Sequence, residues 1–273
     1  MISNHVDYCI QKYNDIFLAE IKAGKDESFA QKKAIRDSTI EAMRTFQHVE
    51  PAEIWKAVYT AHIHRKSGIV DTEVIKQIVS AENSWKKSSG HAFEEMIKLL
   101  GNLVLEDKGI TIHLQKELNH LIRDKEIHNE VRDISWLKEQ ITSSVFDLYI
   151  SVLKDNKRYV FGCIQSKTSI RDRVTRDREP SMHAMEAFFW STAIVLDGDF
   201  LKLPKFKAMV NGGTTEYVNN GWHGMYVFSD QYTDGRIYPL DIDLTTFVEH
   251  AQKASHYWLT QRQWFNSEWN ATN

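Results

Sequence analysis

The chain has 273 residues, of which 42% are hydrophobic and 26% are charged, a balance typical of a globular protein. No apolar run approaches the roughly 20 residues that a membrane span needs, and two cysteines imply no disulfide framework, so we expect a soluble cytoplasmic protein. The formal net charge of −3 argues weakly against a nucleic-acid partner for the chain as a whole.

Apolar residues recur at helical spacing through the first third of the chain. Gly24 and Gly68 are expected helix ends, and Pro51 suits the first turn of a helix. The pattern predicts helices over residues 6–24, 27–46, 51–68 and 71–85. We therefore assign residues 1–85 to a helical N-terminal region and residues 86–273 to a second domain.

A further helix is expected over residues 88–109, with Ser88 or Ser89 as its N-cap and Gly109 as its end. One face of this helix is apolar. At 100° per residue, Glu95 points nearly opposite that face and should be solvated, whereas Glu94 lies on its flank. Glu94 is therefore placed to reach a cleft beside the core.

The second domain continues with alternating strands and helices. Residues 144–153 and 158–169 read as strands joined by the turn "KDNK", which predicts an antiparallel hairpin in a central sheet. The largely apolar segment 180–196, with Pro180 near its start, is expected to be a buried helix. Strands over 224–230 and 236–244 and an amphipathic helix over 245–265 follow, so the fold class is α/β with a helical N-terminal addition.

The predicted hairpin places Asp147 on one strand and Lys167 at the end of its neighbour. A carboxylate between Phe146 and Leu148 is costly to bury unless it is paired or bound to a metal. The two side chains can form a structural ion pair, or they can hold Mg²⁺ and assist hydrolysis of a phosphodiester. Spacing alone favours the ion pair.

Charge is concentrated around and beyond Lys167. Residues 154–178 contain eight basic and three acidic side chains, a net charge of +5 in a chain whose total is −3. Within this stretch, Arg171 and Arg173 present planar forks suited to guanine, and Asp172 can accept from the cytosine amino group. A self-neutralised surface loop is the alternative interpretation.

The segment from Ser166 to Arg173, with Asp147 and "SGHAFEE" upstream, resembles the PD-(D/E)xK nucleases. More narrowly, it resembles type II restriction endonucleases that recognise sites containing CCGG, and in particular the BsaWI/AgeI branch. The resemblance runs from about residue 88 to residue 182. It implies a restriction-endonuclease-like core with a central mixed sheet flanked by helices, so that residues 86–273 would form the catalytic domain.

The resemblance also implies a role for each matching residue. Asp147 would be the central metal ligand, Lys167 the catalytic lysine, and Glu94 the helix-borne acid that supports the metal or its water. The triplet that would read the CCGG core in the major groove is Arg171, Asp172 and Arg173.

One position departs from the general motif, because Gln165 stands where an acid two residues before the lysine is usual. A neutral amide is a poor ligand for Mg²⁺. In the CCGG group this acid lies further along the chain, and Asp177 is the first choice for it, ahead of Glu179 and Glu186. The departure also keeps open a catalytically inactive DNA-binding module.

The function implied by the resemblance is Mg²⁺-dependent cleavage of double-stranded DNA at a palindrome with a CCGG core, leaving four-base 5′ overhangs. A palindrome contacted on both strands favours a homodimer with two-fold symmetry. The N-terminal helices are candidates for dimerisation or for additional DNA contacts. A repair nuclease that recognises DNA structure rather than sequence is the weaker alternative.

Overall fold

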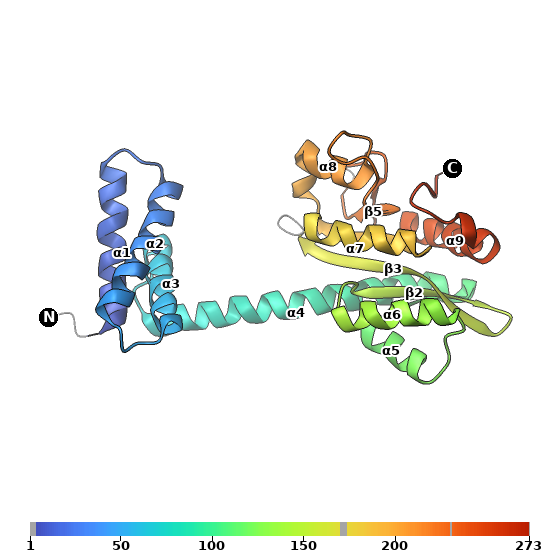
Figure 1. Ribbon diagram of the computed structural model, residues 1–273, viewed down its shortest axis with the longest axis horizontal. Helices are drawn as coiled ribbons and strands as arrows, with labels where there is room; N and C mark the ends of the chain where they lie inside the picture. Colours follow the sequence, from blue (N-terminus) through green and yellow to red (C-terminus); the bar gives the residue numbers. More distant parts are fainter. Residues whose placement is uncertain (1–3, 170–173, 230, 273) are drawn as a thin grey trace. The chain divides into compact units, whose positions relative to one another are not determined.

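The computed structural model describes residues 4–169, 174–229 and 231–272, and the chain divides into two compact units between Lys86 and Lys87. The first unit is helical, as its periodicity predicts (Figure 1). Its helices are α1 (His5–Lys22), α2 (Glu27–Thr45), α3 (Pro51–Ser67) and the start of α4 (Thr72–Leu105). The apolar faces of α1, α2 and α3 enclose a core that includes Cys9, Tyr13, Phe17, Ala34, Ile54 and Val58.

Helix ends in this unit follow from their local chemistry. The side chain of Asn4 accepts from the backbone N–H of Asp7 and caps α1, and Asp26 caps α2 in the same way through Phe29. Pro51 occupies the first turn of α3, which ends at Gly68 in the left-handed region at φ 74°. The helix boundaries predicted at Pro51 and Gly68 are therefore confirmed.

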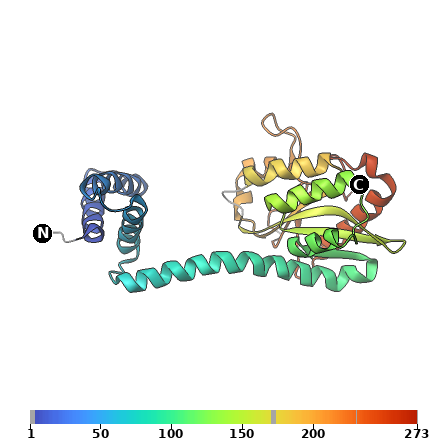
Figure 2. The same ribbon diagram turned by 60° about the horizontal axis from the view of Figure 1, so that its bottom comes forward.

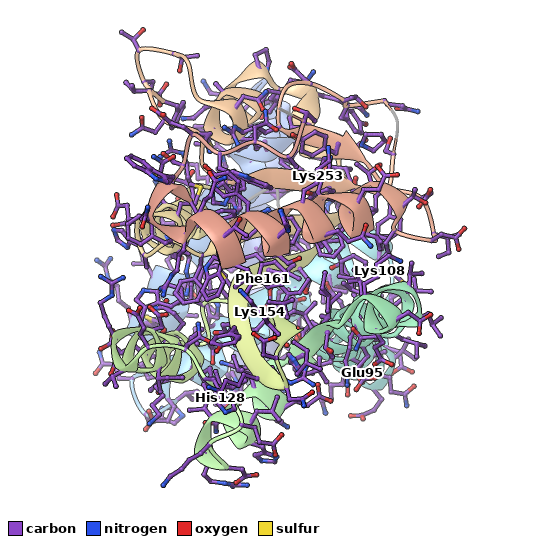
Figure 3. All side chains as sticks on the ribbon, turned by 90° about the vertical axis from the view of Figure 1, so that its right-hand side faces the viewer. Glu95, Lys108, His128, Lys154, Phe161 and Lys253 are labelled. Carbon is purple, nitrogen blue, oxygen red and sulfur yellow. The ribbon has the colours of Figure 1, made fainter. Side chains whose placement is uncertain are left out.

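The predicted break before residue 88 is wrong. Helix α4 runs without interruption from Thr72 to Leu105, a 3₁₀ turn follows over Glu106–Lys108, and Gly109 ends it at φ 70°. Serine costs only a few tenths of a kcal/mol to about 0.7 kcal/mol inside a helix, so a possible cap residue does not by itself start a new helix. The expected solvation of Glu95 is confirmed, since its side chain is exposed and lies on the outside of α4 (Figure 3).

The second unit is built on a six-stranded mixed sheet in which the strands lie in sequence order. The first three strands pair antiparallel, and the last four pair parallel. The strands are β1 (Ile110–Leu114), β2 (Leu148–Lys154), β3 (Lys157–Ser169), β4 (Trp190–Asp197), β5 (Gly224–Val227) and β6 (Ile237–Pro239). This is the central mixed sheet that the resemblance implies.

The predicted hairpin is present between β2 and β3. Asp155 and Asn156 form its two-residue turn with φ angles of 51° and 58°, the left-handed pair that matches the twist of antiparallel strands. Helix α6 ends at Ser143 and Ser144 turns the chain at φ 52°, so β2 begins at Leu148, later than expected. Asp147 therefore lies immediately before the strand.

Helices cover both faces of this sheet. Figure 2 shows α6 (Val131–Ser143) and α7 (Val174–Glu186) on one side of the sheet and α4 on the other. Helices α5 (Gln115–Arg123) and α8 (Pro204–Asn211) contribute to the first side, and α9 (Thr245–Gln261) packs with α4 on the second. Phe161 is fully buried between the sheet and α9 (Figure 3).

The segment predicted as one buried helix over residues 180–196 has a different structure. Helix α7 begins six residues before Pro180 and ends at Glu186, and the rest of the segment is strand β4. Apolar runs of this length do not separate a buried helix from a central parallel strand, because both are apolar on every side. Pro180 consequently lies inside α7 rather than at its start.

His223 joins three parts of the second unit. Its Nδ1 accepts from the backbone N–H of Ser191 at 3.0 Å, so its Nε2–H donates to the carbonyl of Asn266 at 2.8 Å. Burial lowers the pKa of His223 to about 3. Burial also lowers the pKa values of His113 and His250 to about 4, so the folded unit holds all three imidazoles neutral.

We expect these depressed pKa values to make the protein acid-sensitive. Below about pH 6.5 the unfolded chain binds protons at these histidines and the folded chain does not. The free energy of unfolding is therefore highest above about pH 6.5 and declines as the pH falls below that value. Between pH 7 and pH 5, His223 alone should remove about 2 kcal/mol. Urea unfolding of wild type and His223→Asn at several pH values measures the free energy of unfolding. The variant should show a shallower dependence of that free energy on pH. An unchanged dependence, matching that of a variant of the exposed His256, would contradict the assignment.

Among the residues that the structure describes, no helix has both the length and the apolar composition needed to cross a membrane.

Candidate active site

Asp147 and Lys167 meet at one edge of the β2–β3 hairpin. Lys167 Nζ lies 2.7 Å from Asp147 Oδ2, and the backbone N–H of Ser166 donates to the same oxygen at 2.8 Å. The side chains of Lys167 and Asp147 are 15% and 20% exposed, so the pair is shielded but reachable from solvent. Such a site can present a charge to a ligand, which a fully buried ion pair cannot.

Local packing explains why Asp147 points toward Lys167. Its neighbours Phe146 and Leu148 are buried, and the backbone N–H of Asp147 donates to the carbonyl of Ile164 at 3.1 Å. This bond extends the β2–β3 pairing by one residue beyond the strand. The backbone at position 147 is thus held on both sides, which limits the directions that the carboxylate can take.

Glu94 belongs to the same electrostatic environment. It lies on α4 beside the buried residue Phe93, and His91 Nδ1 is 3.3 Å from its Oε2. Burial raises the pKa of the Glu94 carboxyl, and the negative charge of Asp147 raises it further, whereas His91 and Lys167 lower it. Glu94 is half-buried, as expected for a residue on the flank of the helix.

A hollow of about 320 Å³ opens beside Glu94. Its walls come from the part of α4 that belongs to the second unit and from the junction of β1 with α5. The lining residues are His91, Glu94, Glu95, Leu114, Gln115 and Lys116. Acidic and basic side chains therefore share one hollow, and Glu94, which lines it, also feels the charges of Asp147 and Lys167.

Asp177, Glu179 and Glu186 occupy different surroundings on α7. The backbone carbonyl of Asp177 accepts from the Gln165 side chain at 2.9 Å, and its Oδ2 is buried. Glu179 and Glu186 are both exposed, the latter at the C-terminal end of the helix. Of the three acids, Asp177 is the one that contacts the residue two positions before Lys167.

Gln165, which stands where the general motif has an acid, makes two hydrogen bonds through its side chain. Its side chain is 1% exposed, and its Oε1 accepts from the indole N–H of Trp222 at 2.8 Å. Both ends of the amide are therefore engaged by protein groups. Sequence reasoning missed these contacts, and the signal for them was an amide directly after the apolar run of residues 160–164. It also missed His91, although its i,i+3 spacing from Glu94 was visible.

The triplet Arg171, Asp172 and Arg173 lies outside the described residues. Strand β3 ends just before this segment at Ser169, and α7 begins just after it at Val174. The segment thus joins the strand that carries Lys167 to the helix that carries Asp177.

A mixed sheet whose hairpin pairs an aspartate with a lysine, next to an acid from a preceding helix, is the arrangement of the PD-(D/E)xK nucleases. Residues 126–264 match the family described as BsaWI restriction endonuclease type 2. The chain belongs to this BsaWI restriction endonuclease family and is a type II site-specific deoxyribonuclease.

Two solved structures match most of the chain's length. The crystal structure of the pre-specific restriction endonuclease BsaWI–DNA complex is 68% identical, with 98% of each chain covered and a TM-score of 0.86. The crystal structure of the specific restriction endonuclease AgeI–DNA complex is 19% identical, covers 90% of this chain and 91% of that chain, and has a TM-score of 0.48. The comparison with curated proteins gave no match.

Membership of this family implies dependence on a divalent metal. Over the described ranges, no three or more histidine, cysteine, aspartate or glutamate side chains form a ready metal cage. Mg²⁺ does not require one, because it binds through one or two carboxylates and completes its shell with water and substrate phosphate. The carboxylate oxygens of Asp147 and the neighbouring acids fit such a hard cation.

Proposed function

We propose that this enzyme cuts double-stranded DNA at a palindromic site with a CCGG core, before the first cytosine, and leaves four-base 5′ overhangs. The observation that carries the proposal is the 68% identity to BsaWI, a restriction endonuclease crystallised with DNA, over nearly the full length of both chains. Since its DNA substrate would enter the cell from outside, we place the enzyme in the cytoplasm.

We assign Asp147 and Asp177 as the ligands of Mg²⁺ in this reaction. When bound, Mg²⁺ screens the charge of the phosphate and lowers the pKa of a bound water. Support for Asp147 comes from its largely shielded carboxylate, which lies just before β2 and is 20% exposed. Support for Asp177 comes from its position in the first turn of α7, where its backbone carbonyl accepts from the Gln165 side chain and its Oδ2 is buried.

Lys167 supplies a positive charge at the reacting phosphate and orients the attacking water. Its ammonium is held by Asp147 at 2.7 Å, so little side-chain freedom remains to be lost when DNA binds. Glu94 accepts a hydrogen bond from the water and draws its proton toward the protein. Its partial burial favours the protonated form, which suits a group that receives a proton.

The choice of Asp177 leads to a direct prediction. Asp177→Asn removes one negative charge with little change of shape, and we expect the single-turnover cleavage rate to fall by roughly 100-fold or more. Glu179→Gln and Glu186→Gln are matched controls on the same helix and should cut within about twofold of wild type. If the loss appears in either control and Asp177→Asn cuts normally, the relocated acid has been misassigned.

We assign Arg171, Asp172 and Arg173 to reading of the CCGG core in the major groove. Their support is chemical, since guanidinium forks match guanine and a carboxylate matches the cytosine amino group. Arg173→Ala should weaken binding to the cognate duplex far more than binding to an unrelated duplex. An equal loss on both would identify Arg173 as a phosphate contact instead.

A palindromic site read on both strands requires two copies of the segment, so we propose that the enzyme acts as a homodimer. The helical N-terminal region, residues 1–85, is our candidate for dimer or outer DNA contacts. Light scattering of the protein with a cognate duplex tests the stoichiometry, and two chains per duplex is the expected result. One chain per cleaved duplex would contradict the proposal.

The core of the site is tested with two pools of duplexes that differ only in the two central base pairs of the core. In one pool CCGG is flanked by random bases, and in the other CGCG is flanked by the same random bases. With Mg²⁺, a subset of the first pool should be cut and the second should remain intact. Cleavage of branched or single-stranded DNA with no fixed position would instead favour a structure-specific nuclease.

A further inference from the structure

Gln165 lies on β3 next to helix α7 and contacts that helix through its side chain. It lies on β3 two residues before Lys167, so their side chains leave the strand on the same side. That side faces α7, and the Gln165 side chain is almost fully buried there. The residue is thus placed between the strand that carries the lysine and the helix that carries Asp177.

The contacts of Gln165 require an amide. Its Oε1 accepts from Trp222 Nε1–H at 2.8 Å, and its Nε2–H donates to the backbone carbonyl of Asp177 at 2.9 Å. An amide has both a donor and an acceptor, whereas an ionised carboxylate has acceptors alone. A glutamate at this position would therefore direct an oxygen at the carbonyl of Asp177 and leave that carbonyl without the bond.

Helix α7 needs support at this turn. Pro180 lies inside it and has no N–H, so the carbonyl four residues earlier, at Arg176, lacks its usual helical donor. Two side chains tie this part of α7 to its neighbours, one from β3 and one from the helix itself. Gln165 binds Asp177, and Arg178 donates to the carbonyls of Met209 at 3.1 Å and Asn219 at 2.5 Å.

We propose that Gln165 and Trp222 form a clamp that positions the first turn of α7, and with it Asp177, against Lys167. Gln165 is then a positioning residue, and the missing acid of the general motif is replaced by a group with its own task. This inference rests on the proposed function, because it takes Asp177 as the acid of the site. It also predicts that a glutamate at position 165, the acid of the general motif, would lower the activity of the enzyme.

The test uses the full-length protein and a duplex that wild type cuts. Gln165→Met removes both hydrogen bonds at similar volume, Gln165→Glu keeps one, and Trp222→Phe removes the indole donor. Trp258→Phe is the matched control, because it deletes a second buried indole bond, to the Phe188 carbonyl at 2.8 Å, outside the clamp. Three quantities are measured: the single-turnover cleavage rate, the Mg²⁺ concentration at half-maximal rate, and the Kd for DNA with Ca²⁺ in place of Mg²⁺.

We expect Gln165→Met and Gln165→Glu to lower the cleavage rate by roughly 100-fold, the cost of displacing a reacting group by about 1 Å. Both should raise the half-maximal Mg²⁺ concentration and change the Kd for DNA by less than about threefold. Trp222→Phe should move the rate and the Mg²⁺ requirement in the same direction by a smaller factor. Adding Trp222→Phe to Gln165→Met should cost nothing more, since the clamp is already broken.

Three results would contradict the proposal that Gln165 and Trp222 form a clamp. Gln165→Met could cut normally while Asp177→Asn is inactive, which refutes the clamp and leaves the proposed function intact. Trp258→Phe could lower the rate as much as Trp222→Phe, which would reduce the effect to general loss of stability. Normal cutting by Asp177→Asn would remove the acid assignment and the inference with it.

Discussion

Replacing Asp147 by alanine should abolish DNA cleavage and leave DNA binding largely intact. Asp147 Oδ2 holds the ammonium of Lys167 at 2.7 Å and the backbone N–H of Ser166 at 2.8 Å, and we assign the carboxylate as a Mg²⁺ ligand. Its loss removes a metal ligand and frees Lys167 at once. We expect the single-turnover rate to fall by about 1,000-fold or more, since each contribution alone is worth on the order of 100-fold.

The control for Asp147→Ala is the removal of an acid from the same hairpin. Asp155 lies at the hairpin turn and is exposed, so Asp155→Ala should cut at the wild-type rate. DNA binding is measured in Ca²⁺ by gel shift. Cleavage by Asp147→Ala within tenfold of wild type would show that the active site lies elsewhere.

Lys167→Ala is the second substitution for which we expect a loss of about 1,000-fold or more in cleavage rate. The change removes the positive charge that we place at the reacting phosphate, and no neighbouring residue on β3 can replace it, since Ser166 and Ser169 are neutral. Asp147 keeps its bond to the backbone of Ser166, so the carboxylate stays in place.

Lys157 is the matched control for Lys167, because it lies at the other end of the same strand and is exposed. Lys157→Ala should cut DNA at the wild-type rate. Lys167→Ala should also keep its affinity for DNA in Ca²⁺ within about tenfold. A parallel loss of cutting and affinity would make Lys167 a binding residue rather than a catalytic one.

Local signals predicted the elements that depend on local chemistry. The sequence "KDNK" has two residues that tolerate the left-handed region, and the hairpin turn lies there, at Asp155 and Asn156. Pro51 and Gly68 marked the ends of α3 for similar reasons. The meeting of Asp147 with Lys167 follows from the hairpin, so it was predictable from residues that are near in sequence.

Elements that depend on burial were harder to predict. Strand β4 was expected as a helix because its apolar run is central in the sheet and carries no alternation. Strand β1 and helices α5 and α6 were not predicted at all. Helix α4 was expected in two parts, because Ser88 and Ser89 look like caps until the continuous apolar face on both sides is known.

In the candidate site too, features set by nearby residues were predicted and features set by distant residues were not. Glu94 was expected on the flank of its helix, and it is half-buried there. The contacts of Gln165 join it to Trp222, 57 positions along the chain, so no local pattern contained them. Long-range hydrogen bonds of this kind become visible only when the sheet and α7 are assembled.

The central claim is sequence-specific cleavage at CCGG, and the most direct measurement is to sequence the ends that the enzyme makes. Purified protein is incubated with Mg²⁺ and a long DNA of known sequence, and every new end is mapped. We predict discrete fragments whose 5′ overhangs all begin at a CCGG core, with the flanking bases read from the same data. Ends scattered without a common sequence, or no ends despite stable DNA binding, would contradict the account.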